Sequence, residues 1–241
     1  MAFSKVPTLT GLRHAPGLVG WGRALAAVAC ALALIAGVAA APDFDRLLAG
    51  FMQRWGNNAP TQRFGAWREL IAASALVPEA ERLKRVNDFF NRQLVFSDDP
   101  VIWGQADYWA TPIESLGRGA GDCEDFSIAK YYTLRMVGVE SAKLRLIYVR
   151  ARTGVADSTP TQAHMVLAFY AQPDAEPLVL DNLIGDIRPA SRRPDLSPVF
   201  SFNSEGVFVG ATGKDNTVQA GLGRLSRWED LLRRARAEGF E

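Results

Sequence analysis

The sequence is poor in the residue types that could perform catalysis with a thiol. It contains two cysteines, Cys30 and Cys123, and two histidines, His14 and His164. Cys30 and His14 lie in the first 41 residues, which have the composition of an export segment. A nucleophilic cysteine needs a base to accept its proton, and that base needs a partner that orients it. We therefore predict that Cys123 is a nucleophile and that His164 is its base.

Asp181 is the predicted orienting partner of His164. Asp181 closes one predicted strand and His164 begins the strand before it, so an antiparallel pairing would bring the two together. Cys123 lies at the start of a predicted helix, where free N–H groups and the helix dipole favour a thiolate and an oxyanion. Asn182 is an alternative orienting residue. Purely structural roles, a polar strand residue for His164 and a turn cap for Asp181, are further alternatives.

Acidic residues surround the thiol. Asp122 precedes Cys123, and Glu124 and Asp125 follow it. Their negative charge opposes ionisation of the thiol unless a cation neutralises it. Several hard carboxylate oxygens suit Ca²⁺, so we predict a calcium site at these three acids, with Asp107 as a weaker further candidate. The alternative is that the acids only favour the start of a helix.

The elements that must position these residues change in type along the chain. Apolar residues at helical spacing predict helices over 43–55, about 61–75 and 78–94, and another from Cys123 to the glycine at 138. Residues 95–121 are expected to be irregular. Their aromatic residues, Trp103, Tyr108 and Trp109, could line a cleft or pack onto the core.

Alternating apolar residues follow the cysteine helix and predict a sheet. Strands are expected over 142–151, 163–170 and 177–183, with a late hairpin that turns at 204–206. A final helix is expected near the C-terminus, with Ser226 and Glu229 at capping-box spacing. Helices followed by consecutive strands indicate an α+β fold, in which the N-terminal helices and the cysteine helix pack on an antiparallel sheet.

The N-terminal 41 residues read as a secretory signal peptide. Their only charged residues are three bases, and an apolar stretch that ends in small residues runs over 24–41. An uncleaved membrane anchor is the alternative. We therefore predict a periplasmic domain over 42–241, in which an unpaired thiol would be unusual for an oxidising compartment. The net charge of the whole chain is +1, which gives no indication of a nucleic-acid partner.

Three segments carry a resemblance to a known family. The sequences DYWATPIESLGRGAGDCEDFSIAKY, AHMVLAFY and LVLDNL resemble the bacterial transglutaminase-like cysteine proteinases, in particular the LapG-type periplasmic proteases. The resemblance extends over about residues 44–232. It implies a papain/transglutaminase-like fold and a catalytic triad of Cys123, His164 and Asp181.

The resemblance also implies a substrate and a regulator. The substrate would be a large surface adhesin, cleaved in its N-terminal region at a dialanine site in a Ca²⁺-dependent reaction that controls biofilm attachment or dispersal. An inner-membrane receptor that responds to cyclic di-GMP would sequester the protease, and we expect it to insert an aromatic side chain near Trp103–Trp109. Two other functions remain open, namely amide acyl transfer on the same triad and a non-catalytic, calcium-dependent binding module.

Overall fold

The structure, a computed structural model, describes Met1 and residues 44–56, 58–152, 161–211 and 222–240. The compact unit comprises Pro42–Glu241. The expected signal peptide, over 1–41, lies outside the described residues apart from Met1. Among the helices of the described ranges, none has both the length and the apolar character needed to span a bilayer.

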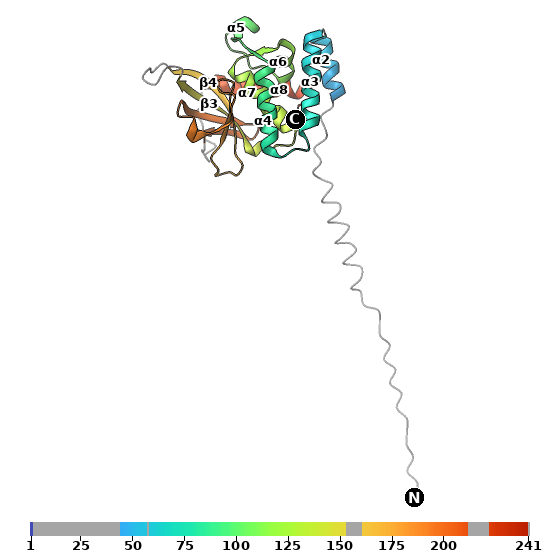
Figure 1. The fold of residues 1–241 in the computed structure, drawn as a ribbon, viewed down its shortest axis with the longest axis vertical. Coiled ribbons are helices and arrows are strands. Elements are labelled where there is room, and N and C mark those ends of the chain that lie inside the picture. Colours follow the sequence, from blue (N-terminus) through green and yellow to red (C-terminus); the bar gives the residue numbers. More distant parts are fainter. Residues whose placement is uncertain (2–43, 57, 153–160, 212–221, 241) are drawn as a thin grey trace. The chain divides into compact units, whose positions relative to one another are not determined.

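Three helices form the N-terminal part of the described chain, as predicted. They are α2 (Phe44–Trp55), α3 (Asn58–Ser74) and α4 (Glu79–Gln93). Each buries an apolar stripe, and the ring centroids of Phe51 on α2 and Phe64 on α3 lie 4.8 Å apart. The helices gather on one side of the unit and the sheet lies on the other (Figure 1).

The segment that follows α4 is more regular than the sequence analysis predicted. It contains four short elements: β1 (Val95–Phe96), α5 (Asp99–Ile102), α6 (Pro112–Arg118) and β2 (Ala120–Gly121). Thr111 and Glu114 form a complete capping box at the start of α6, and Gly119 ends that helix with a φ of 69°. The Thr-Pro-x-Glu pattern of this cap is readable in the sequence, so the prediction of an irregular segment was wrong.

Helix α7 (Cys123–Met136) carries the cysteine at its first residue. Asp122 is the N-cap, and its side chain accepts a hydrogen bond of 3.2 Å from the backbone N–H of Glu124. Gly138, with a φ of 86°, lies just beyond the end of the helix, as expected. The helix is buried around most of its circumference because the other helices cover one side and the sheet covers the opposite side.

The sheet has six strands in the order β6-β5-β4-β3-β7-β8, and all neighbouring strands are antiparallel. The strands are β3 (Leu144–Arg152), β4 (Thr161–Phe169), β5 (Leu178–Leu180), β6 (Arg188–Pro189), β7 (Leu196–Asn203) and β8 (Gly206–Val209). Short 3₁₀ turns, η1 (Ser141–Lys143) and η2 (Ala190–Arg192), precede β3 and β7. The predicted strands and late hairpin are confirmed, whereas β6 and η2 were not expected.

The last helix, α8 (Leu222–Glu238), begins earlier than predicted. Ser226 lies inside it, so the capping box proposed for Ser226 is wrong. Arg234 of α8 donates hydrogen bonds of 2.6 Å to the carboxylate of Glu114 on α6 and to the carbonyl of Trp109. These bonds connect α8 to α6 and to the segment that precedes α6.

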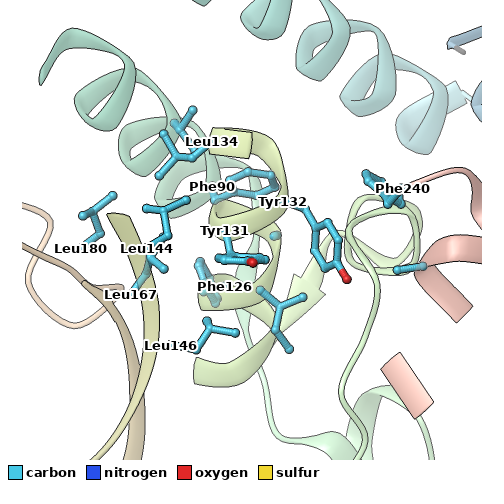
Figure 2. Packing of buried hydrophobic residues seen from close by; sticks show 14 of the residues in the cluster. Phe90, Phe126, Tyr131, Tyr132, Leu134, Leu144, Leu146, Leu167, Leu180 and Phe240 are labelled. Carbon is cyan, nitrogen blue, oxygen red and sulfur yellow. The ribbon is translucent and has the colours of Figure 1, made fainter. Parts of the chain in front are cut away.

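A continuous apolar core joins α7 to both layers. Leu144, Leu146 and Leu167 of the sheet face α7, where Phe126 and Tyr131 lie (Figure 2). On another side of α7, the ring of Tyr132 lies 5.2 Å from that of Phe240, which follows α8. The arrangement confirms the predicted α+β class, with the cysteine helix packed on an antiparallel sheet.

Candidate active site

The structure brings His164 and Asp181 into direct contact. His164 is the fourth residue of β4, and Asp181 directly follows β5, which pairs antiparallel with β4. The Nε2 atom of His164 lies 2.8 Å from Oδ1 of Asp181, and both side chains are almost completely buried. The strand that carries His164 begins two residues earlier than predicted, yet the expected pairing of strands still places the two residues together. Asp181, and not Asn182, is the partner of the imidazole.

The carboxylate of Asp181 is fully engaged by hydrogen bonds. Its Oδ1 atom also accepts from the N–H of Leu183 at 3.1 Å, and its Oδ2 atom accepts from Nη2 of Arg193 at 2.7 Å. Burial alone would raise the pKa of Asp181, but the hydrogen bond and charge of His164 and the bond from Arg193 lower that pKa to about 2. Asp181 is therefore ionised at neutral pH.

Cys123 lies at the N-terminus of α7, beside β4. The backbone of Met165, the residue after His164, acts to lower the pKa of its thiol. Ser127, one turn further along α7, donates to the carbonyl of the same Met165 at 3.1 Å. The thiol of Cys123 donates to Oε2 of Glu124 at 2.6 Å, and burial together with this acid raises the pKa of the thiol.

The acids around Cys123 converge with one acid that the sequence analysis missed. Carboxylate oxygens of Asp99, Asp122 and Asp125 lie within 4.8 Å of one another, and Glu124 joins Asp122 and Cys123 in an overlapping group. Asp99, Asp122 and Asp125 each accept a hydrogen bond from a backbone N–H with one carboxylate oxygen. Asp99 accepts from the N–H of residue 108 at 2.5 Å, and Asp125 accepts from the N–H of residue 110 at 2.7 Å.

The remaining oxygens of this acid cluster (Asp99, Asp122, Glu124 and Asp125) are suited to a cation. Oδ1 of Asp99 and Oδ2 of Asp125 are buried and have no hydrogen-bond partner among the residues that the structure describes. Burial first, and then mutual repulsion, raise the pKa of Asp99 to about 6 and that of Asp122 to about 10, and the pKa of Asp125 rises as well. A hard divalent cation bound by these oxygens would compensate both the burial of the negative charges and their mutual repulsion.

Asp107, the fourth predicted metal ligand, has a different neighbour. Its carboxylate lies 3.1 Å from Nε of Arg227 on α8. The charge of Asp107 contributes to the raised pKa of Asp99, so the residue borders the acid cluster. Its role as a ligand stays a prediction.

Known proteins resemble this chain along most of its length. The family model of the bacterial transglutaminase-like cysteine proteinases (BTLCP) matches residues 69–194. The solved structure of Legionella pneumophila LapG is 40% identical, has a TM-score of 0.65, and the match covers 79% of this chain and 96% of that chain. The chain belongs to the bacterial transglutaminase-like cysteine proteinases.

Two further LapG structures of Legionella pneumophila match equally well. One is described as calcium-bound, with 39% identity, a TM-score of 0.66 and coverage of 79% of this chain and 97% of that chain. The other is described as EGTA-treated, with 40% identity, a TM-score of 0.66 and coverage of 79% and 96%. Among curated proteins, no match was found. The predicted family and its fold are thus confirmed, and the protein is a cysteine protease.

The aromatic residues near the site of this cysteine proteinase divide into two kinds. Trp109 is buried and stacks on Phe202 with centroids 5.6 Å apart, so of the two alternatives it packs onto the core. Trp103 and Tyr108 are partly exposed, and their ring centroids lie 4.8 Å apart. These two residues remain candidates for a binding surface beside the acid cluster.

Asp99 and Arg193 are the site residues that sequence reasoning missed. Asp99 stands before a proline in a segment predicted to be irregular, and the pairing of β1 with β2 brings it close to the cysteine. Arg193 follows η2, a turn without a recognisable pattern. Nothing in the sequence connects either residue to the site, because both depend on tertiary contacts.

The low pKa of Asp181 predicts an acid-sensitive contribution to stability. Because the pKa falls from 3.8 in the unfolded chain to about 2 in the folded chain, ionised Asp181 stabilises the fold above pH 4. That contribution, on the order of 2 kcal/mol, is lost as the pH falls from 4 towards 2. In urea unfolding, the parent should lose about 1 kcal/mol more than Asp181→Asn between pH 5 and pH 3. Parallel pH dependences of the two proteins would contradict the prediction.

Proposed function

We propose that the protein is a periplasmic, calcium-dependent cysteine endoprotease that uses Cys123, His164 and Asp181. The observation that carries this proposal is the buried contact between His164 and Asp181, beside a thiol at a helix N-terminus, in a member of this family.

The contact with Asp181 supports a different task for each nitrogen of His164. Because Nε2 contacts Asp181, Nδ1 is the nitrogen that exchanges a proton with the thiol of Cys123. The resulting thiolate attacks the carbonyl carbon of the scissile peptide bond, and the imidazolium then gives its proton to the leaving amine. Water hydrolyses the acyl-enzyme, with His164 again acting as base. Backbone N–H groups at the start of α7 are the donors for the oxyanion.

The acid cluster is the proposed Ca²⁺ site. The two buried carboxylate oxygens without partners support it, and so does the relative that is described as calcium-bound. Ca²⁺ accepts six to eight oxygen ligands with flexible geometry, whereas Mg²⁺ requires a smaller octahedron and retains its water. Bound Ca²⁺ supplies positive charge against the acids beside the thiol. Glu124, whose Oε2 accepts a hydrogen bond from the thiol of Cys123, would help to hold the ion.

The proposed substrate is the N-terminal region of a large surface adhesin, cleaved at a dialanine site to control biofilm attachment or dispersal. The proposed regulator is an inner-membrane receptor for cyclic di-GMP that sequesters the protease from the periplasmic side. Both follow from the resemblance to the LapG-type periplasmic proteases, to one of which the chain is 40% identical. Trp103 and Tyr108 offer a partly exposed aromatic surface for a side chain of the receptor. Export through residues 1–41 places the protease in the periplasm, and the mature protein should lack them.

The triad is tested by cleavage of a recombinant N-terminal adhesin fragment, with the products identified by mass spectrometry. Cys123→Ala should abolish cleavage, His164→Ala should nearly abolish it, and Asp181→Ala should retain more, because an orienting group is partly replaceable. Asp186→Ala is the matched control for Asp181→Ala, because Asp186 is an exposed acid in the same loop. Cleavage by Cys123→Ala would refute the protease, and a cross-linked product would indicate acyl transfer.

The metal site is tested by the effect of Asp99→Asn on the melting temperature, which should have opposite signs with and without Ca²⁺. With EGTA, Asp99→Asn should raise the melting temperature, because it removes one buried charge from a repelling cluster. With saturating Ca²⁺, the same variant should melt below the parent and cleave more slowly, because a ligand is lost. Asp98→Asn, at the exposed neighbouring acid, should behave like the parent in both conditions. A Ca²⁺-dependent melting shift in Asp99→Asn as large as that of the parent would place the ion elsewhere.

The receptor proposal is tested by competition. The purified periplasmic domain of the candidate receptor should inhibit cleavage of the adhesin fragment, and Trp103→Ala should weaken its binding. Arg118, whose guanidinium lies over the ring of Trp103 at 5.1 Å, would keep its place in the control variant Trp103→Phe. Simultaneous binding of receptor and adhesin fragment, with no loss of cleavage, would rule out competition.

A further inference from the structure

Arg193 is a buried arginine whose guanidinium donates hydrogen bonds to two carboxylates, those of Asp195 and Asp181. Its side chain is 1% exposed. Nε donates to Oδ1 of Asp195 at 3.0 Å, and Nη2 donates both to Oδ2 of Asp195 at 2.8 Å and to Oδ2 of Asp181 at 2.7 Å. The backbone is fixed as well, because the N–H of Arg193 donates to the carbonyl of Ala190 and its own carbonyl accepts from Leu196.

The bond from Arg193 determines which oxygen of Asp181 faces the imidazole. With Oδ2 bound to Arg193, Oδ1 is the oxygen left for Nε2 of His164. Without Arg193, the carboxylate would be held through Oδ1 alone, by the N–H of Leu183 and by His164, and could rotate more freely about its last torsion, because sp² termini have broad torsional minima. Its Oδ2 atom would also be left buried without a donor. Displacements of about 1 Å at a catalytic group can cost about a hundredfold in rate.

Two other side chains near Asp181 do not substitute for Arg193, and the N–H of Leu183 binds only Oδ1. Asn91 of α4 binds the backbone carbonyl of Asp181 and not its carboxylate. Lys130 of α7 acts on Asp181 through its charge, but burial lowers the pKa of this lysine to about 7, and its other charged neighbour is Asp88. At neutral pH Lys130 is only partly charged. Arg193 is a permanently charged donor bound directly to the carboxylate.

We propose that Arg193 is a positioning residue of this cysteine protease, which fixes the carboxylate of Asp181 so that His164 presents Nδ1 to the thiol. Asp195 in turn fixes the plane of the guanidinium through a two-pronged contact. This inference rests on the proposed function, because it takes Asp181 as the orienting residue of the triad.

The first test is a double-mutant cycle on cleavage of the adhesin fragment by the full chain at saturating Ca²⁺. Arg193→Met should lower kcat about tenfold or more with little change in KM, and Arg193→Lys should recover part of the loss. Adding Arg193→Met to Asp181→Ala should cause no further loss, because both changes remove the same effect. Arg192→Met, at the exposed neighbouring arginine, should leave kcat unchanged. Additive losses would overturn the proposal.

The second test does not depend on activity. In full-length Cys123→Ala, proton NMR should show a low-field resonance from the hydrogen-bonded imidazole N–H of His164, and further substitution Asp181→Ala should abolish it. Arg193→Met should broaden or shift this resonance, whereas Arg192→Met should preserve it. If only the melting temperature of Arg193→Met changes, Arg193 is structural and the proposal fails.

Two outcomes separate this proposal from the proposed function. If Cys123→Ala itself shows no such resonance, the contact between His164 and Asp181 does not form, and the triad fails together with the role of Arg193. If the resonance is present but insensitive to Arg193, only the positioning role fails. Should Arg193→Met not fold, Asp195→Ala replaces it, because Asp195 is partly exposed. The same changes, reduced to about threefold in kcat, are then expected, and an unchanged resonance and kcat would overturn the proposal.

Discussion

Burial of helix α7 between the other helices and the sheet is the constraint on which the rest of the structure depends. A helix that is covered around most of its surface cannot rotate or slide without opening cavities in both layers, because interiors are close-packed. The position of Cys123 is therefore set by apolar contacts along the whole of α7, such as that between Phe126 and the sheet. The bond from Ser127 to the backbone of Met165 then fixes α7 against the strand of the histidine.

Asp181 and the acid cluster both lie near this helix, and their pKa values are shifted in opposite directions. Asp181 has hydrogen-bond donors on both oxygens and a low pKa. Asp99 and Asp125 each keep one oxygen without a partner, and their pKa values are raised. The difference follows from the supply of donors and positive charge. The protein itself compensates the charge of Asp181, whereas the unpartnered oxygens of the acid cluster are open to a cation or to protonation.

Local sequence signals sufficed for the fold class and for much of the site. Helical and alternating periodicities identified the major helices and strands, and the scarcity of Cys and His singled out Cys123 and His164. Antiparallel pairing then led to Asp181, because neighbouring strands have a predictable register. Asp99 and Arg193 could not be found in this way. Asp99 reaches the acid cluster through the pairing of β1 with β2, and Arg193 reaches Asp181 from an unpredicted turn.

The bond from Arg234 to the carbonyl of Trp109 has a consequence for the order in which the protein can assemble. The N–H of the next residue, Ala110, donates to Asp125, so one peptide segment is held by α8 on one side and by the acid cluster on the other. A nascent chain that lacks α8 lacks one of these two anchors. The acid cluster thus gains its second anchor only after the last helix docks, so the segment that carries Ala110 is fixed late in the synthesis of the chain.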